Sequence, residues 1–196
     1  KCPLCETPVS QSLYWSWWKG KKMSVHQRSL FCHEHRKRTA QAEYTKRGYP
    51  SIDWAALPQR IETHHPRLID VLRNETGSRK STFREAHRQR MLAGDRTTVR
   101  ALLQRDELLE SKTGYYGPRG RRAFMEIITL QLADVIREAV ERDEVVSWGG
   151  MASFVQSVLV PEVAVQLVMQ DLGVGERVAV EVLRESREVG ALVNEE

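Results

Sequence analysis

Apolar residues in the second half of the chain recur with the spacing of amphipathic helices. Phe124, Ile127, Ile128 and Leu132 begin a series that continues to Val140, so we expect one long helix over residues 123–142. A shorter amphipathic helix is predicted at residues 99–109. The same period in both segments indicates a core built between helices.

Prolines and glycines divide the last quarter of the chain. Residues 151–160 predict a helix that leads into an extended turn, because Pro161 follows. Pro161 and Glu162 then begin another helix, which ends at Gly173. Residues 176–189 form the last predicted helix, with Gly190 as its C-cap.

The first half contains shorter helical segments. Residues 34–47 are rich in strong helix formers, and we expect this helix to stop at Gly48. Asp53 is a candidate N-cap, and Pro66 marks another helix start. Residues 82–92 predict a helix whose cationic side chains form either a basic binding face or an ordinary solvated face.

All three cysteines lie in the first 32 residues and indicate a metal site. Cys2 and Cys5 form a C-x2-C pair, and Cys32 and His35 form a C-x2-H pair. Three thiolates and one imidazole make the closed tetrahedral shell of structural zinc, and an odd number of cysteines is unusual for a disulfide framework. His35 is favoured over His33 because a residue three positions after Cys32 shares its face of a helix. The alternative is three reduced, unliganded thiols.

Three tryptophans lie between the two ligand pairs. Trp15, Trp17 and Trp18 are followed by lysines at positions 19, 21 and 22. We expect the indoles to pack inside the metal module, because a small metal-stabilised unit has little other core. The alternative is stacking on nucleic-acid bases beside lysines that contact phosphates.

Composition limits the class of protein. The chain has 196 residues, of which 41% are hydrophobic and 29% charged, which is enough for a packed core. No stretch approaches the roughly 18 apolar residues of a membrane span, so no membrane association is expected. We predict a mainly α fold with an N-terminal zinc knuckle (Cys3His) packed on a bundle of about six to eight helices. Residues 1–48 would form the knuckle and its following helix, and residues 49–196 a helical domain, the two forming one continuous unit.

Charge is distributed unevenly along the chain. Residues 1–122 carry 25 basic and 12 acidic side chains, whereas residues 123–196 carry 5 basic and 14 acidic. Such a chain can bind a polyanion with its basic half, self-associate, or neutralise its two halves within the fold. The candidate nucleic-acid contacts are Lys19, Lys21, Lys22, Arg36, Lys37, Arg38, Arg119, Arg121 and Arg122.

One loop has an unusual sequence. It consists of Gly114, Tyr115, Tyr116, Gly117, Pro118, Arg119 and Gly120, which we call the signature loop. It lacks the Lys and Ser/Thr of a phosphate-binding P-loop. The loop could either cap the core with its tyrosines or present its arginines to a ligand.

The signature loop resembles the C-terminal domain of the restriction of telomere capping protein 4 family. Residues 2–5, 31–36, 48–50, 52–54, 158–162 and 183–186, together with Gly190, fit the same resemblance. The resemblance implies a fungal protein of the nucleus, or of nucleus and cytoplasm, with a genetic link to telomere capping. It implies no catalytic activity. It also agrees with a chain that starts at Lys1 and forms part of a longer protein.

These observations favour a non-enzymatic, zinc-stabilised nuclear interaction module of a chromatin- or telomere-associated protein. It would bind protein partners, could also self-associate, and would have no small-molecule substrate. The alternative is direct, weakly sequence-specific DNA binding through residues 1–122. An enzyme is not expected, because the His33-Glu34-His35 run is followed by no P-C-x-x-C, as a zinc deaminase would require.

Overall fold

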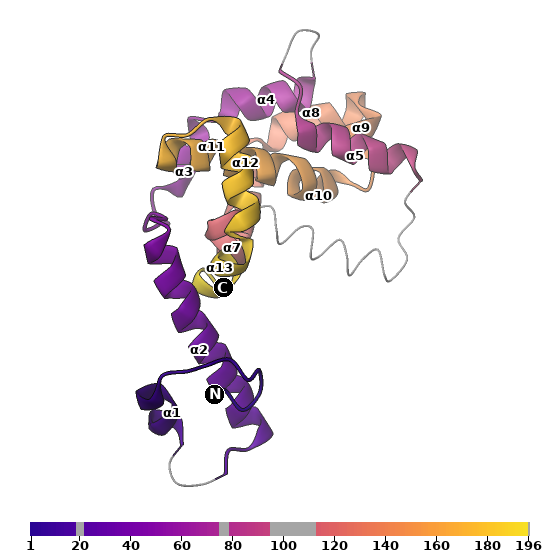
Figure 1. The fold of residues 1–196 in the computed structure, drawn as a ribbon. Coiled ribbons are helices and arrows are strands. Elements are labelled where there is room, and N and C mark those ends of the chain that lie inside the picture. Colours follow the sequence, from indigo (N-terminus) through magenta and orange to yellow (C-terminus); the bar gives the residue numbers. More distant parts are fainter. Residues whose placement is uncertain (19–21, 75–78, 95–112, 196) are drawn as a thin grey trace.

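The computed structural model describes residues 1–18, 22–74, 79–94 and 113–195, and these ranges contain helices and no β-strand. The mainly α fold is confirmed. A long helix, α2, connects a small N-terminal module (residues 1–35) to a helical body (residues 49–195) (Figure 1). The predicted helix over residues 99–109 lies outside the described residues.

The elements are α1 (Gln11–Trp17), α2 (Val25–Lys46), α3 (Leu57–Glu62), α4 (His65–Arg73), α5 (Thr82–Leu92), η1 (Gly114–Tyr116), α7 (Gly117–Gln131), α8 (Ala133–Arg142), α9 (Glu144–Ser147), α10 (Met151–Phe154), η2 (Val155–Leu159), α11 (Val160–Leu172), α12 (Glu176–Glu185) and α13 (Arg187–Val193).

Helix α2 buries different faces in its two halves. Phe31, Cys32 and His35 are buried in the N-terminal module, whereas Ala40 and Tyr44 are buried near the body. Nine residues separate His35 from Tyr44, about two and a half helical turns, so the two side chains point in opposite directions. One rigid helix therefore has two independent apolar contacts. It begins nine residues earlier than position 34, where we predicted it, because Ser24 and Gln27 form a capping box.

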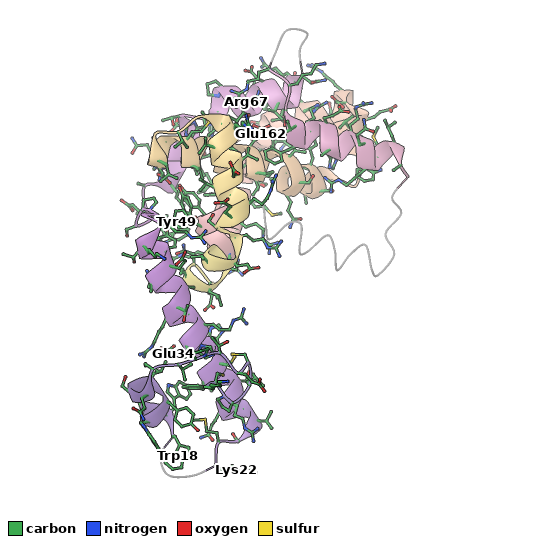
Figure 2. All side chains as sticks on the ribbon, viewed as in Figure 1. Trp18, Lys22, Glu34, Tyr49, Arg67 and Glu162 are labelled. Atoms are coloured by element: carbon green, nitrogen blue, oxygen red, sulfur yellow. The ribbon has the colours of Figure 1, made fainter. Side chains whose placement is uncertain are left out.

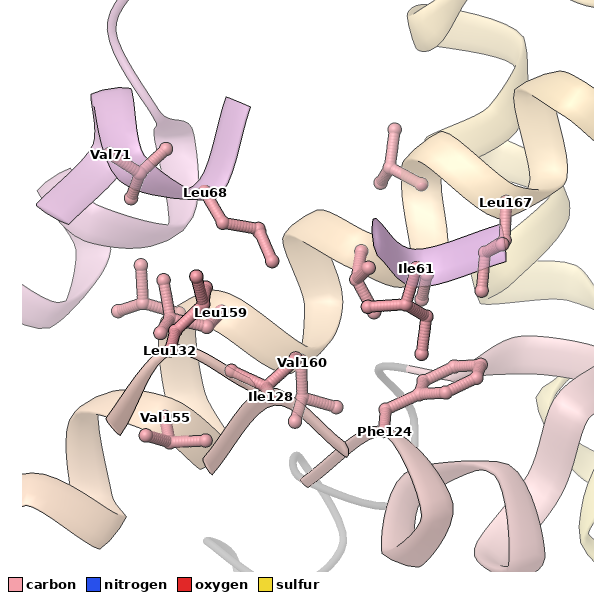
Figure 3. Packing of buried hydrophobic residues seen from close by; sticks show 14 of the residues in the cluster. Ile61, Leu68, Val71, Phe124, Ile128, Leu132, Val155, Leu159, Val160 and Leu167 are labelled. Atoms are coloured by element: carbon pink, nitrogen blue, oxygen red, sulfur yellow. The ribbon is translucent and has the colours of Figure 1, made fainter. Parts of the chain in front are cut away.

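The core of the body surrounds α11. Ile61, Leu68, Phe124, Ile128 and Leu167 are each fully buried and come from four helices, α3, α4, α7 and α11 (Figure 3). Phe124 and Ile128 lie four positions apart on α7, which is the helical spacing that the sequence predicts there. The predicted 123–142 helix, however, is divided into α7 and α8, where the chain turns and α8 packs against α4.

The helical run Met151–Leu172 is continuous, and the predicted extended turn before Pro161 is wrong. Residues Val155–Leu159 form a π-helical turn, in which the Val160 amide donates to the carbonyl of Val155. This wider turn changes the hydrogen-bond register just before Pro161, whose ring would otherwise clash with the preceding α-helical turn. The helix therefore passes through the proline without ending.

The same run has the length and composition of a membrane-spanning helix, which the sequence pattern did not indicate. Its most apolar window has a mean hydropathy of 1.5, and 78% of that window is buried inside the protein. Its apolar side chains are used by the core of the body.

Close backbone contacts hold the signature loop against α13. A Cβ atom on Gly190 would lie 2.0 Å from the carbonyl oxygen of Gly114, and one on Gly117 would lie 2.2 Å from the carbonyl oxygen of Gly190. Gly190 is therefore a buried packing residue inside α13, and its predicted role as a C-cap is wrong. The last predicted helix is divided at Ser186 into α12 and α13, which lets α13 lie against both η1 and α2.

Asp171 joins three elements of the body. Its carboxylate accepts hydrogen bonds from the Tyr115 hydroxyl at 2.6 Å, the Tyr116 hydroxyl at 2.5 Å and the Arg60 guanidinium at 2.6 Å. Burial raises the pKa of both tyrosines, so both phenols remain protonated donors. The carboxylate thus connects η1, α3 and α11.

We predict that Gly190→Ala destabilises the protein by about 2 kcal/mol or more, because its new methyl group has to displace backbone rather than a flexible side chain. Gly175→Ala is the matched control, since a Cβ atom there has no neighbour within 4 Å and φ is −74°. Urea unfolding of both variants measures the difference. Equal stability of the two variants would contradict the packing described above.

We predict that Asp171→Asn lowers the free energy of unfolding by about 2 kcal/mol, because the neutral amide accepts fewer and weaker bonds from three donors. Asp134→Asn serves as the control: Asp134 also pairs with an arginine, but its side chain is 91% exposed. Its expected effect is within about 0.5 kcal/mol. Thermal unfolding at constant pH compares the stability of the two variants. An Asp171→Asn variant as stable as wild type would contradict the role of Asp171 in connecting η1, α3 and α11.

Candidate metal centre

The first two predicted ligands lie on a tight N-terminal turn. The Glu6 amide donates to the Cys2 carbonyl at 3.0 Å, and the Cys2 amide donates to the Thr7 carbonyl at 2.9 Å. The Leu4 amide also points at the Cys2 sulfur, 3.5 Å away. Glu6 has a positive φ of 59°, which turns the chain sharply after Cys5. This turn presents both thiols toward α2.

The other two ligands come from the first half of α2. Cys32 and His35 are three residues apart and share the face of α2 that is buried in the module. The ligand atoms of Cys2, Cys5, Cys32 and His35 all lie within 4.8 Å of one another. A tetrahedral zinc–thiolate shell places its donor atoms about 3.8 Å apart. The four residues therefore fit one metal ion, with small shifts of side chains.

The structure distinguishes His35 from His33. The Nε2 atom of His35 lies 3.2 Å from the Cys5 sulfur. His33 points away from the cysteines, and its Nε2 lies 3.1 Å from a carboxylate oxygen of Glu195. His35, and not His33, therefore lies together with the three cysteines, at the helical spacing predicted for the fourth ligand.

The thiols differ in their electrostatic surroundings. Hydrogen bonding with Thr7 lowers the pKa of Cys5 to about 6, whereas burial raises the pKa of Cys32 to about 11. A bound cation would favour the thiolate at both positions. Cys2 and Cys32 are buried and Cys5 is exposed, so only one side of the group meets solvent.

A small aromatic cluster supports the ligands. Phe31 is fully buried, and the rings of Tyr14 and Trp17 meet it edge-on at centroid distances of 5.9 and 5.8 Å. The expectation that all three indoles pack here holds for Trp17 alone. Trp15 and Trp18 are exposed, because α1 has seven residues and only one of its faces meets α2.

The seven candidate nucleic-acid contacts that the structure describes do not form one patch. Lys22, Arg36, Lys37 and Arg38 belong to the N-terminal module and α2, whereas Arg119, Arg121 and Arg122 lie on α7 in the body (Figure 1). Lys19 and Lys21 lie outside the described residues. Two of the cations have ionic partners: Lys37 with Glu195 at 3.1 Å and Arg38 with Glu34 at 2.7 Å.

The signature loop caps the core, which is the first of its two predicted alternatives. Tyr115 and Tyr116 are fully buried and stacked, with ring centroids 4.8 Å apart. The Arg119 guanidinium lies over the Trp54 ring at 4.4 Å. The Asn194 amide group donates to the Tyr115 carbonyl at 2.6 Å. The loop therefore locks the C-terminal segment to the body.

Several buried polar contacts had no signal in the sequence. Arg67 pairs with the buried Glu162 at 3.3 Å, and His87 meets Ser157 at 2.7 Å. Arg84, which we placed on a basic or solvated face, is buried and pairs with Asp143. These partners are between 59 and 95 positions apart along the chain. No local pattern could have identified them.

Comparison with known proteins agrees with the resemblance noted above. No curated protein and no solved structure matches the chain. A family model described as the RTC4-like domain matches residues 76–195. That range includes the signature loop, Asp171 and Gly190, whereas the four metal-ligating residues precede it. Because the match covers more than half of the sequence, the chain belongs to the RTC4-like domain family.

Proposed function

We propose that this protein is a non-enzymatic, zinc-stabilised interaction module that binds protein partners in chromatin- or telomere-associated assemblies. Its site of action would be the nucleus, with a further pool in the cytoplasm. The observation that carries this proposal is the group of three cysteines and one histidine formed by the N-terminal turn and the first half of α2. A four-ligand shell stabilises a fold and leaves no open coordination position for a substrate.

Zinc is the metal that suits these donors. Thiolates and imidazole are its usual ligands, whereas Mg²⁺ and Ca²⁺ prefer oxygen. Among its described residues, the module has few buried apolar side chains of its own: Leu13, Met23 and Phe31, together with Cys2 and Cys32. A metal ion would supply the cohesion that so small a core lacks.

Exposed apolar residues support an interaction role. Leu4, Trp15, Val25 and Leu30 are between 45% and 78% exposed, and all belong to the N-terminal module. The module lies at the far end of α2 from the body, where a partner can reach it (Figure 2). Several large apolar side chains exposed on one small unit are typical of contact sites. Self-association of the basic and acidic halves would use other surfaces and is compatible with this role.

The buried polar pairs favour a non-enzymatic role. His87 and Ser157 have the contact of a base and a nucleophile, but their exposed fractions are 0% and 2%. A substrate could not reach this pair without unfolding of the core around it. The contact is better explained as a hydrogen bond between α5 and the π-helical turn.

We predict one zinc ion per chain in the purified protein, and its loss in a His35→Gln variant. His33→Gln is the matched control, because His33 lies on the same helix but contacts Glu195 instead of the cysteines. Elemental analysis of both variants gives the metal content. Hydrogen exchange should show faster exchange for residues 1–35 in His35→Gln, with the core helices of the body still protected. Full zinc occupancy in His35→Gln, or metal-free wild type, would contradict the site.

The interaction role is tested with the same pair of variants. Affinity capture from nuclear extract should recover a common set of proteins with wild type and with His33→Gln. His35→Gln should lose those proteins that bind through the folded module. If no protein is recovered specifically by any of the three, the interaction role fails, whereas the zinc measurement stands separately.

A further inference from the structure

Two tryptophans are exposed next to each other at the end of α1. Trp15 and Trp18 are three residues apart, which places them on one side of the helical segment. Their ring centroids lie 4.8 Å apart, at an interplanar angle of 64°. Trp15 is 52% exposed and Trp18 is 36% exposed. The two indoles form an aromatic surface that is open to solvent, which we call the indole platform.

The indole platform adjoins the core of the module through Tyr14, whose ring meets Trp15 edge-on at a centroid distance of 5.8 Å, but its two indoles are not part of that core. Leu13 and Trp17, on the other side of α1, belong to the cluster around Phe31. The rings of Tyr14 and Trp17 on α1 contact α2 at Phe31, and neither ring belongs to the indole platform. Large aromatic side chains left exposed together are typical of a binding surface.

The segment that contains the indole platform has an excess of positive charge. Residues 1–48 contain 10 lysines and arginines but only 3 glutamates, and no aspartate. Lys22 is exposed, and Figure 2 shows it at the same end of the module as Trp18. An excess of cations beside exposed aromatic rings is complementary to a ligand that combines negative charge with flat rings.

Three arginines of the body have partners inside the protein. Arg60 donates to Asp171, and Arg84 donates to Asp143 and to the Val71 carbonyl. The Arg119 guanidinium lies over Trp54. The N-terminal module is thus the part of the described chain where exposed aromatic rings and exposed cations occur together.

We propose that Trp15 and Trp18 bind single-stranded nucleic acid by stacking on its bases, while Lys22 contacts the phosphate backbone. Unpaired bases expose their faces, whereas the faces of bases in a duplex are covered by their neighbours. An acidic peptide would complement the charge but would bring no row of flat rings. This binding site goes beyond the proposed function, and it requires the folded module but no protein partner.

The experiment uses the full chain loaded with zinc and a fluorescent thymidine homo-oligomer. Fluorescence anisotropy at low and physiological salt gives the Kd, and a duplex of the same length is the comparison ligand. We expect tighter binding to the single strand and weaker binding at higher salt, because phosphate contacts release counterions. Tryptophan emission should fall on binding, since stacking brings bases onto the indoles.

Variants separate stacking from charge. Trp15→Ala and Trp18→Ala should each weaken binding by about tenfold, and the corresponding Phe variants should recover most of the affinity. Leu130→Ala, which removes a 78% exposed side chain from α7, should leave the Kd unchanged. Lys22→Glu should weaken binding and reduce its salt dependence, whereas Lys46→Glu makes the same charge change at the opposite end of α2. Zinc content and thermal unfolding of each variant verify the fold.

Three results would overturn the proposal. The first is no binding of the single strand at low salt. The second is equal binding to single strand and duplex with no effect of the tryptophan variants, which would indicate phosphate contacts alone. The third is loss of a captured protein in the tryptophan variants together with no nucleic-acid binding, which would make the indole platform a protein contact.

Discussion

The architecture depends on the fact that α2 buries opposite faces in its two halves. Helix α2 has no single apolar stripe along its length. Each half is therefore held by its own packing contact. Ala40 and Tyr44 are secured by the large core of the body, to which α13 contributes. Cys32 and His35 face only a seven-residue helix and a short turn. The candidate metal ligands Cys32 and His35 lie on the half of α2 where packing alone is weakest, which is where a bound metal would add most to stability.

Inside the body, the signature loop holds η1 and α13 tightly together. Its glycines allow the backbones of η1 and α13 to approach more closely than any side chain permits, and its tyrosines carry their hydroxyls to one carboxylate, Asp171. Burying that carboxylate is costly unless all of its bonds are made. The Gly114–Gly190 contact and the hydrogen bonds of Asp171 therefore support each other. A shift of the loop would leave the largely buried Asp171 carboxylate with fewer hydrogen-bond donors. The family match covers the signature loop, Asp171 and Gly190, but not the four candidate metal ligands.

Local chemistry made part of this structure predictable. Helix α5 occupies the predicted residues 82–92, and α2 ends at the predicted glycine, because caps and helix formers act over a few residues. His35 was identifiable because a helix brings positions i and i+3 together. The π-helical turn before Pro161 and the role of Gly190 were not predictable, since each depends on a hydrogen-bond register or a backbone contact set by distant elements. The same applies to the burial of Arg84.

The tryptophans show most clearly how fold limits inference from composition. Three indoles near four ligands indicate a core, but a short helix has only one face to bury, and that face accepts Trp17. The remaining two are exposed because of geometry, not because the sequence is less apolar there. Positive charge is concentrated in the same segment, whereas Arg60, Arg84 and Arg119 of the body are engaged with Asp171, Asp143 and Trp54. The helical body thus supplies a stable base for α2, and the exposed tryptophans lie near the end of that helix that contributes to the cysteine and histidine group.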